Sequence, residues 1–446
     1  MKRTIITLAL AAGMLLPATA QQRWTLRECI DHAVENNIEI RQTALGVENA
    51  ALDLNTAQNS RLPNLSAGVN QSFSFGRTSI DTGGDSPEYM NTQTSGTSLN
   101  LSAAMPIFQG FRIANQIRSS KLDLAAAAAG LERAKESLEL NVAALYLDVL
   151  FKKEIAAVYR EQTELVREQV ENTTVMVDEG AVARSQLYEI EAQLASAQVN
   201  EVRADNDVAL ALLTLSQALN LSDAGGFDIA VVDAAALAPG TSRLLPDEIY
   251  RTALEIKPAV READYMLQSS VAGVKIARSA ALPSLSLSAG AGAGYTYMFG
   301  QDFPQQSLAD QIRNRHSESV GLGLSIPIFN RHATRNNIRA AELGVMNRTL
   351  ALEGVRQTLY KEINQAWQRA VAAATSYEAS TKALAASQEA FRAMELRYTA
   401  GKATAYEYSE ASANLASSRS EQTRARYDYL FSSRVLDFYS GLPIEI

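Results

Sequence analysis

Few side chains in this sequence have the types and the spacing that catalysis or metal binding requires. The three histidines, His32, His316 and His332, are too scattered along the chain to predict a metal site. The sequence also contains no G-x-S-x-G, H-E-x-x-H or P-loop motif. We therefore expect neither an enzyme nor a bound cofactor or metal.

Two acidic residues form the clearest candidate site. Glu407 and Glu410 lie three residues apart, which places both on one face of a helix. If three copies of the chain met around an axis, these carboxylates would converge, attract cations and raise one another's pKa. The alternative is that both are ordinary solvated side chains near the start of a helix.

The sequence is a tandem duplication. Two segments about 221 residues apart are similar in sequence: LSAAMPIFQGFRIANQIR at 101–118 and LGLSIPIFNRHATRNNIR at 322–339. We place repeat 1 at residues 21–245 and repeat 2 at 246–446. A period this long predicts a doubled domain rather than a solenoid of short units.

The first twenty residues, 1–20, predict a cleaved signal peptide. They combine a basic start, an apolar stretch and the A-x-A sequence Ala18-Thr19-Ala20. The exported chain has one cysteine, Cys29, so it cannot form an intrachain disulfide, and we expect this side chain to be buried. The net charge of −8 argues against a nucleic-acid partner.

Each repeat contains two segments in which apolar and polar residues alternate, as in strands. The first pair covers 64–76 and 96–106, and the second covers 284–299 and 318–327. Strands of about ten residues can cross a bilayer, although a soluble sandwich shows the same alternation. Aromatic residues favour the membrane, because they gather at the two ends of the strands: Phe73, Phe75, Tyr295, Tyr297 and Phe299 at one end, and Phe108, Phe111 and Phe329 at the other.

Four strands cannot enclose a lumen, and an open sheet edge in hydrocarbon would leave backbone groups without hydrogen bonds. The pattern therefore predicts an oligomer. A trimer would give a barrel of about twelve strands with the Ser, Gly and Asn side chains facing a water-filled lumen. A dimer of about eight strands is the alternative, but it leaves little open bore.

Long helices follow the strands. We expect helices at about 113–177 and 334–398, returning helices at about 184–220 and 404–440, and shorter ones at about 25–60 and 247–280. The linker 221–245 would lie between stacked helices. The prolines that would mark the junctions of strands and helices are Pro63, Pro106, Pro283 and Pro327. The predicted fold class is mainly α with membrane β: a tandem-duplicated protomer that gives four β-strands to a trimeric 12-stranded barrel and long helices to a periplasmic tunnel.

The segment RYTAGKATAYEYSEASANLASSRSEQTRARYDY at 397–429 carries a more specific signal. With its counterpart around Gly180, the proline-flanked strand pairs and the duplication, it resembles the TolC-like outer-membrane efflux protein family across essentially the whole mature chain. The resemblance implies a homotrimeric, passive channel-tunnel in the outer membrane. Such a channel contacts outer-membrane lipid, docks onto a periplasmic adaptor protein and serves an inner-membrane pump of RND, ABC or MFS type.

The resemblance also implies roles for particular residues. Glu407 and Glu410 match acidic positions inside the family's periplasmic entrance, and Tyr398 matches a tyrosine of the network that holds the entrance shut. Ala403 departs from the pattern, because the family has an arginine there. The hairpin tips that would contact the adaptor are Gly180, Ala181, Val182, Gly401, Lys402 and Ala403.

A different class of protein would also explain the helices. A periplasmic coiled-coil scaffold or adhesin without a barrel would keep them, but it would leave the alternating strands and the aromatic clusters unexplained. The exported substrate, whether drug, metal or polypeptide, is not indicated by the sequence.

Overall fold

The computed structural model describes residues 23–80, 88–221, 226–231, 245–300 and 305–444. The predicted signal peptide and most of the predicted linker 221–245 lie outside these residues. The chain forms two compact units. One contains the chain up to residue 46 together with 128–261 and 353–446, and the other contains 47–127 and 262–352.

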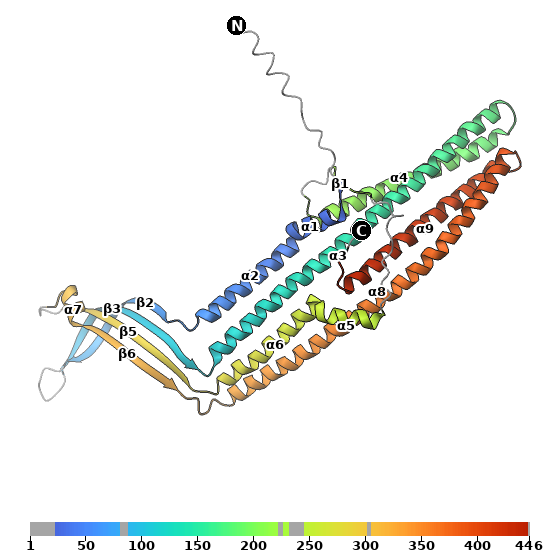
Figure 1. Cartoon of the computed structure of the whole chain (residues 1–446). Coiled ribbons are helices and arrows are strands. Elements are labelled where there is room, and N and C mark those ends of the chain that lie inside the picture. Colours follow the sequence, from blue (N-terminus) through green and yellow to red (C-terminus); the bar gives the residue numbers. More distant parts are fainter. Residues whose placement is uncertain (1–22, 81–87, 222–225, 232–244, 301–304, 445–446) are drawn as a thin grey trace, which may run out of the picture. The chain divides into compact units, whose positions relative to one another are not determined.

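The helices of the two repeats match one another in length (Figure 1). In each repeat they have 11, 22, 67 and 35 residues in chain order. The 67-residue helix of each repeat is therefore about 100 Å long, at 1.5 Å per residue. In the first repeat they are α1 (Leu26–Asn36), α2 (Ile38–Asn59), α3 (Arg112–Asp178) and α4 (Arg184–Ala218). In the second they are α5 (Pro246–Ile256), α6 (Pro258–Ser279), α8 (Ala333–Thr399) and α9 (Ala405–Tyr439).

The shorter helices correct one prediction, because each of the segments 25–60 and 247–280 is two helices instead of one. Asn37 ends α1 in an extended conformation, and its side-chain oxygen accepts hydrogen bonds from the first backbone N–H groups of α2. Lys257 is extended for a different reason, since the ring of Pro258 excludes the helical conformation from the residue before it. Among the residues that the structure describes, none of the helices has the length and apolar character needed to cross a bilayer.

The four predicted strands form one antiparallel sheet in the order β2-β3-β5-β6, and they lie side by side in Figure 1. Their bounds are β2 Asn64–Ile80, β3 Glu88–Gln109, β5 Ser284–Phe299 and β6 His316–Ser325. Strands β2 and β6 are the edges, and no described strand pairs with their outer sides. The sheet is therefore open at both edges in a single copy of the chain.

The bounds of three of the four strands differ from those predicted. Strands β2 and β3 extend beyond 64–76 and 96–106 into the polar segment between these ranges, where Arg77 pairs with Asn91. The hydrogen bonds between antiparallel strands are made by the backbone, and polar residues form them as well as apolar ones do. A strand can therefore continue beyond the segment in which apolar and polar side chains alternate. Strand β6 covers His316–Ser325 rather than 318–327, because Pro327 has no N–H to donate.

The outer end of β5 extends beyond β6, and side chains complete its hydrogen bonds there. The short helix α7 (Leu308–Asn314) begins at an N-cap serine and lies between β5 and β6, where the sequence analysis placed no helix. The side-chain amide of Gln311 accepts from the N–H of Thr296 (2.9 Å) and donates to its carbonyl (2.9 Å). The amide of Gln305 makes the same pair of bonds with Met298. This part of the edge is thereby closed to another strand.

The main apolar core lies in the unit that contains most of the long helices. Its buried side chains come from α1, α3, α4 and α9 and include Cys29, as predicted. The two-residue strands β1 (Arg23–Trp24) and β4 (Asp228–Ile229) pair in parallel beside it. The buried hydroxyl of Tyr146 donates to the carbonyl oxygen of Ala230 (2.9 Å) and lies 3.3 Å from that of Trp24. This contact holds the start of the described chain to the core.

Candidate functional site: a two-faced sheet and the ends of the helical hairpins

The two faces of the sheet differ in chemistry. Residues in register on neighbouring strands lie on the same face, and one row runs Leu65, Ala103, Ala289 and Val320. The next row, on the other face, runs Ser66, Ser102, Gly290 and Ser319. The antiparallel register thus joins the alternation of all four strands into one apolar face and one polar face.

Aromatic side chains lie at both ends of the apolar face, as the sequence predicts. Phe73 and Tyr297 share one row through Ser95, and Phe75 and Phe299 share the next through Gln93. At the other end Phe108 packs edge to face against Phe111, with ring centroids 5.3 Å apart. The distance between the aromatic ends is set by the strands, as in the interfacial girdles of membrane barrels.

The four junction prolines do not all lie where the sequence places them. Pro63 and Pro283 directly precede β2 and β5, and Pro327 follows β6. Pro106 lies within β3, at the point where the pairing with β5 shifts register. A proline without an N–H is tolerated at such an irregularity, so the strand continues for three more residues before α3 begins.

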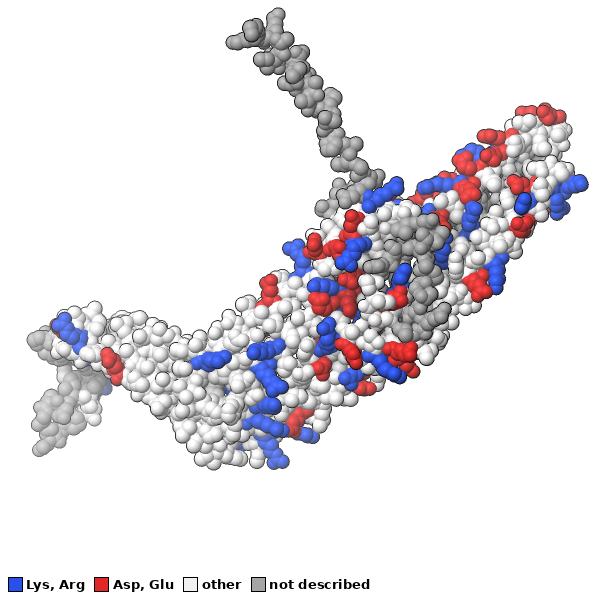
Figure 2. Space-filling model, in the orientation of Figure 1, with Lys and Arg blue, Asp and Glu red and all other residues white. Residues whose placement is uncertain are grey.

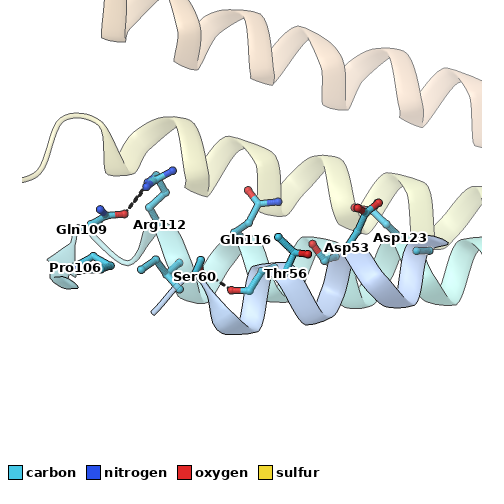
Figure 3. Close-up of a pocket in the computed structure, with 12 residues that line it drawn as sticks. Asp53, Thr56, Ser60, Pro106, Gln109, Arg112, Gln116 and Asp123 are labelled. Carbon is cyan, nitrogen blue, oxygen red and sulfur yellow. Dashed lines mark hydrogen bonds between the residues drawn. The ribbon is translucent and has the colours of Figure 1, made fainter. Parts of the chain in front are cut away.

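A groove of about 470 Å³ lies beside Pro106, between α2, the end of β3 and the start of α3 (Figure 3). Its lining mixes polar and apolar side chains, and Arg112 lies at one end with its guanidinium donating to the side-chain oxygen of Gln109. Asp53 and Asp123 lie at the other end. In the described residues no three His, Cys, Asp or Glu side chains are grouped to hold a metal ion, and this groove offers only two.

The two helical hairpins end in the same way. Gly180 and Gly401 have positive φ angles of 71° and 65°, which glycine adopts without steric cost. The next residue of each turn donates back to the helix: Ala181 to Met176 (2.8 Å) and Lys402 to Arg397 (2.8 Å). This pattern satisfies the last carbonyl groups of α3 and α8 and reverses the chain.

The structure gives Glu407 a local partner that the sequence analysis missed. Thr404 is the N-cap of α9, and its N–H and hydroxyl both donate to Glu407 Oε2, at 2.7 and 3.0 Å. The Glu407 N–H donates to Thr404 Oγ1 in return (3.2 Å). In a single copy these bonds lower the pKa of Glu407, with the backbone bond from Thr404 as the largest cause. The rise that convergence of three copies would cause stays a prediction.

Glu410 lies one turn further along α9 and is exposed. Tyr398 does not face it but stacks on Tyr408, with ring centroids 4.8 Å apart and planes 26° from parallel. Burial raises the pKa of Tyr408. Tyr398 also packs against a small apolar cluster of Val166, Ile190 and Ala405, so it contributes to the packing between the two hairpins.

The sequence analysis did not find the buried polar contacts that join α3 to α9 near the hairpins. Ser409 donates to the side-chain oxygen of Gln169 (3.1 Å), and both residues are buried. Arg426 forms an ion pair with Glu154, which also accepts from Thr423. Residues 240 to 272 positions apart make these contacts, so no local pattern could have indicated them.

Together these features define a class of protein: the protomer of an oligomeric membrane channel that continues into long helical hairpins. One face of its sheet suits lipid, the other suits water, and both edges are open for the same sheet in further copies.

The comparison with known proteins identifies the family. The model of the outer membrane efflux protein family matches residues 29–221 and 249–442, so this chain belongs to that family. It is 24% identical to the outer membrane efflux protein BepC of Brucella suis, over 98% of this chain and 89% of BepC. It is 24% identical to the outer membrane protein TolC of Escherichia coli, over 93% of this chain and 82% of TolC. The crystal structure of CusC shares the fold, with a TM-score of 0.78, 18% identity and coverage of 94% and 92%.

These findings confirm the main predictions. The chain is a duplicated protomer of a trimeric channel whose barrel lies in the outer membrane and whose helices form a tunnel in the periplasm. It serves as a passive exit channel of an efflux or secretion system, and the family is one of channels rather than enzymes. The alternative, a scaffold or adhesin without a barrel, is set aside.

Proposed function

We propose that the ends of the two hairpins form the periplasmic entrance of this channel and contact a periplasmic adaptor protein. The adaptor would connect them to an inner-membrane pump of RND, ABC or MFS type. We also propose that residues 1–20 are a signal peptide that is removed, and that the mature chain consists of two repeats, 21–245 and 246–446.

The observation that carries the entrance proposal is the exposure of Glu410 next to a tightly packed hairpin end. Glu407 is held by Thr404 and Tyr398 by Tyr408, whereas Glu410 makes no hydrogen bond or ion pair among the described residues. Its carboxylate is therefore the group that can meet its equivalents in a trimer and interact with passing cations.

The adaptor proposal is supported by the exposed tip residues. Gly180 and Ala181 at one tip, and Gly401 and Lys402 at the other, are exposed and present small residues and one cation to solvent, whereas Val182 is half-buried. Ala403, next to Lys402, is half-buried. Small residues allow close approach of a partner's backbone, and Lys402 suits an acidic side chain on it.

Single-channel recording tests the entrance. We expect Glu410→Ala to weaken block by multivalent cations roughly tenfold, because a cation near the axis would lose attraction to three carboxylates that salt only partly screens. Glu421→Ala is the matched control. Glu421 is exposed on the same face of α9, eleven residues further from the hairpin end. Equal effects of the two variants would contradict the entrance proposal.

Crosslinking tests the adaptor. A photo-crosslinking residue in place of Lys402 should capture an adaptor in cells, whereas the same residue in place of Lys361 in α8 should not. Capture from both positions, or from neither, would contradict docking at the hairpin tips.

A further inference from the structure

Basic side chains gather where the helices meet the sheet, although the whole chain has a net charge of −8. Figure 2 shows them in blue over the sheet-proximal parts of the helices, beside a sheet surface that carries almost no charge. We call the following set the basic collar: Arg118 and Lys121 on α3, Lys275 and Arg278 on α6, Arg331 just before α8, and Arg335 and Arg339 in its first two turns.

Register shows on which side of the sheet the collar begins. Phe108 pairs with Leu285, and Leu285 pairs with Leu324, so Phe108 lies on the apolar face. Phe111 packs against Phe108, and Arg118 follows Phe111 by seven residues. Phe111 directly precedes α3, which begins at Arg112, so Arg118 lies in the second turn of that helix.

The second repeat builds the same arrangement. Phe329 packs edge to face against His332, with ring centroids 5.5 Å apart. Arg335 and Arg339 lie in the first two turns of α8, which begins at Ala333 directly after His332. Both halves of the unit therefore place basic side chains just beyond the aromatic end of the apolar face.

Most of the collar is not neutralised within the chain. Glu342 accepts from Arg278 (3.1 Å) and Arg339 (3.4 Å). The other five side chains form no ion pair with any residue that the structure describes: Arg118, Lys121, Lys275, Arg331 and Arg335. Cations that lie close together without anionic partners repel one another, so binding of an external anion would stabilise the cluster.

The turn before α8 has the same backbone conformation as the turn before α3. Gly110 of the first repeat has a φ of 58°, and the equivalent residue of the second repeat, Arg331, has a φ of 56°. This conformation disfavours side chains other than glycine, so the second repeat carries an arginine at a strained position in the turn between β6 and α8.

We propose that the basic collar binds the phosphates of anionic phospholipid head groups in the membrane leaflet that faces the periplasm. Phe108 lies at the end of the apolar face and Phe329 follows the end of β6 by four residues, and aromatic rings at such ends meet head groups in membrane barrels. The collar begins within the next two helical turns. Clustered Lys and Arg next to a membrane segment attract anionic lipid, and guanidinium groups also bind phosphate bidentately. The proposal rests on the outer-membrane location but not on the entrance or the adaptor.

Lipid titration of the purified channel tests this proposal. The variant replaces Lys275, Arg118 and Arg335 by glutamine, and its matched control replaces Arg356, Lys361 and Arg392 of α8, which lie outside the collar and are likewise exposed. Fluorescent short-chain phosphatidylglycerol is the probe, with phosphatidylcholine as the uncharged comparison. We expect the parent and the control to prefer phosphatidylglycerol, and the affinity to fall roughly fivefold for each collar charge removed.

Two results would overturn the proposal. One is equal binding of phosphatidylglycerol by the parent, the collar variant and the control. The other is a collar variant that binds phosphatidylglycerol as the parent does but no longer binds isolated peptidoglycan. Conductance in planar bilayers checks that the variants still form channels, and the single replacement Arg335→Gln provides the test if the triple variant does not assemble. Because conductance needs no anionic lipid, a collar that fails this test would leave the channel assignment intact.

Discussion

Gly110 lies at the turn from β3 into α3, where the structure leaves no room for a side chain. A Cβ atom at this position would lie 2.7 Å from the carbonyl oxygen of Ser279 and 2.8 Å from the Cβ of Leu282. The backbone also has a φ of 58°, which side chains other than glycine disfavour. Gly110→Ala therefore combines two independent costs.

The magnitude follows from the two costs. The left-handed conformation costs an alanine about 1–2 kcal/mol. The close contacts add about 1–3 kcal/mol, because one of them is with backbone that cannot rotate away. We expect a total of about 2–5 kcal/mol. Gly180→Ala is the matched control, since its φ is also positive but nothing lies within 4 Å of the added Cβ, so only the first cost applies.

Thermal unfolding in detergent, followed by the helical circular dichroism signal, measures the difference. Gly110→Ala should lower the midpoint by clearly more than Gly180→Ala. At the equivalent position of the second repeat, Arg331→Gly should raise stability by up to about 1 kcal/mol, because it removes the same backbone strain. Equal midpoints for the two alanine variants would refute the reasoning about contact with Ser279 and Leu282.

Two further predictions concern other parts of the chain. Tyr146→Phe removes the hydroxyl that donates to Ala230 and should cost about 1 kcal/mol of stability in the same assay, whereas no change would show that this hydrogen bond holds nothing in place. The pKa of Glu407 is lowered by its bonds from Thr404, so the stability that the carboxylate gives to α9 is present above its ordinary value of 4.5 and is lost as pH falls through the lowered value. Protection of the first-turn amides of α9, measured against their intrinsic exchange rates, should therefore fall at acid pH in the parent but not in Glu407→Gln, and equal pH dependence of protection in both would contradict the capping role.

The sequence by itself determined the elements and most of their lengths. Gly180 and Gly401 end the long helices because glycine adopts the left-handed turn freely, and period-two alternation identifies all four strands. The Thr404-x-x-Glu407 pattern is also local and could have indicated the capping box in advance. These features depend on residues within one or two turns of one another, so the sequence contains the information.

Only the tertiary structure decided which strands are neighbours and which side chains meet across helices. The order β2-β3-β5-β6 joins β3 to β5 across about 190 residues, and the buried pair Gln169–Ser409 joins residues 240 positions apart. The side-chain ladder of Gln305 and Gln311 on β5 likewise depends on how a loop folds back on the sheet. Such contacts form only when distant segments pack together, because no local preference of the chain selects one distant polar partner over another.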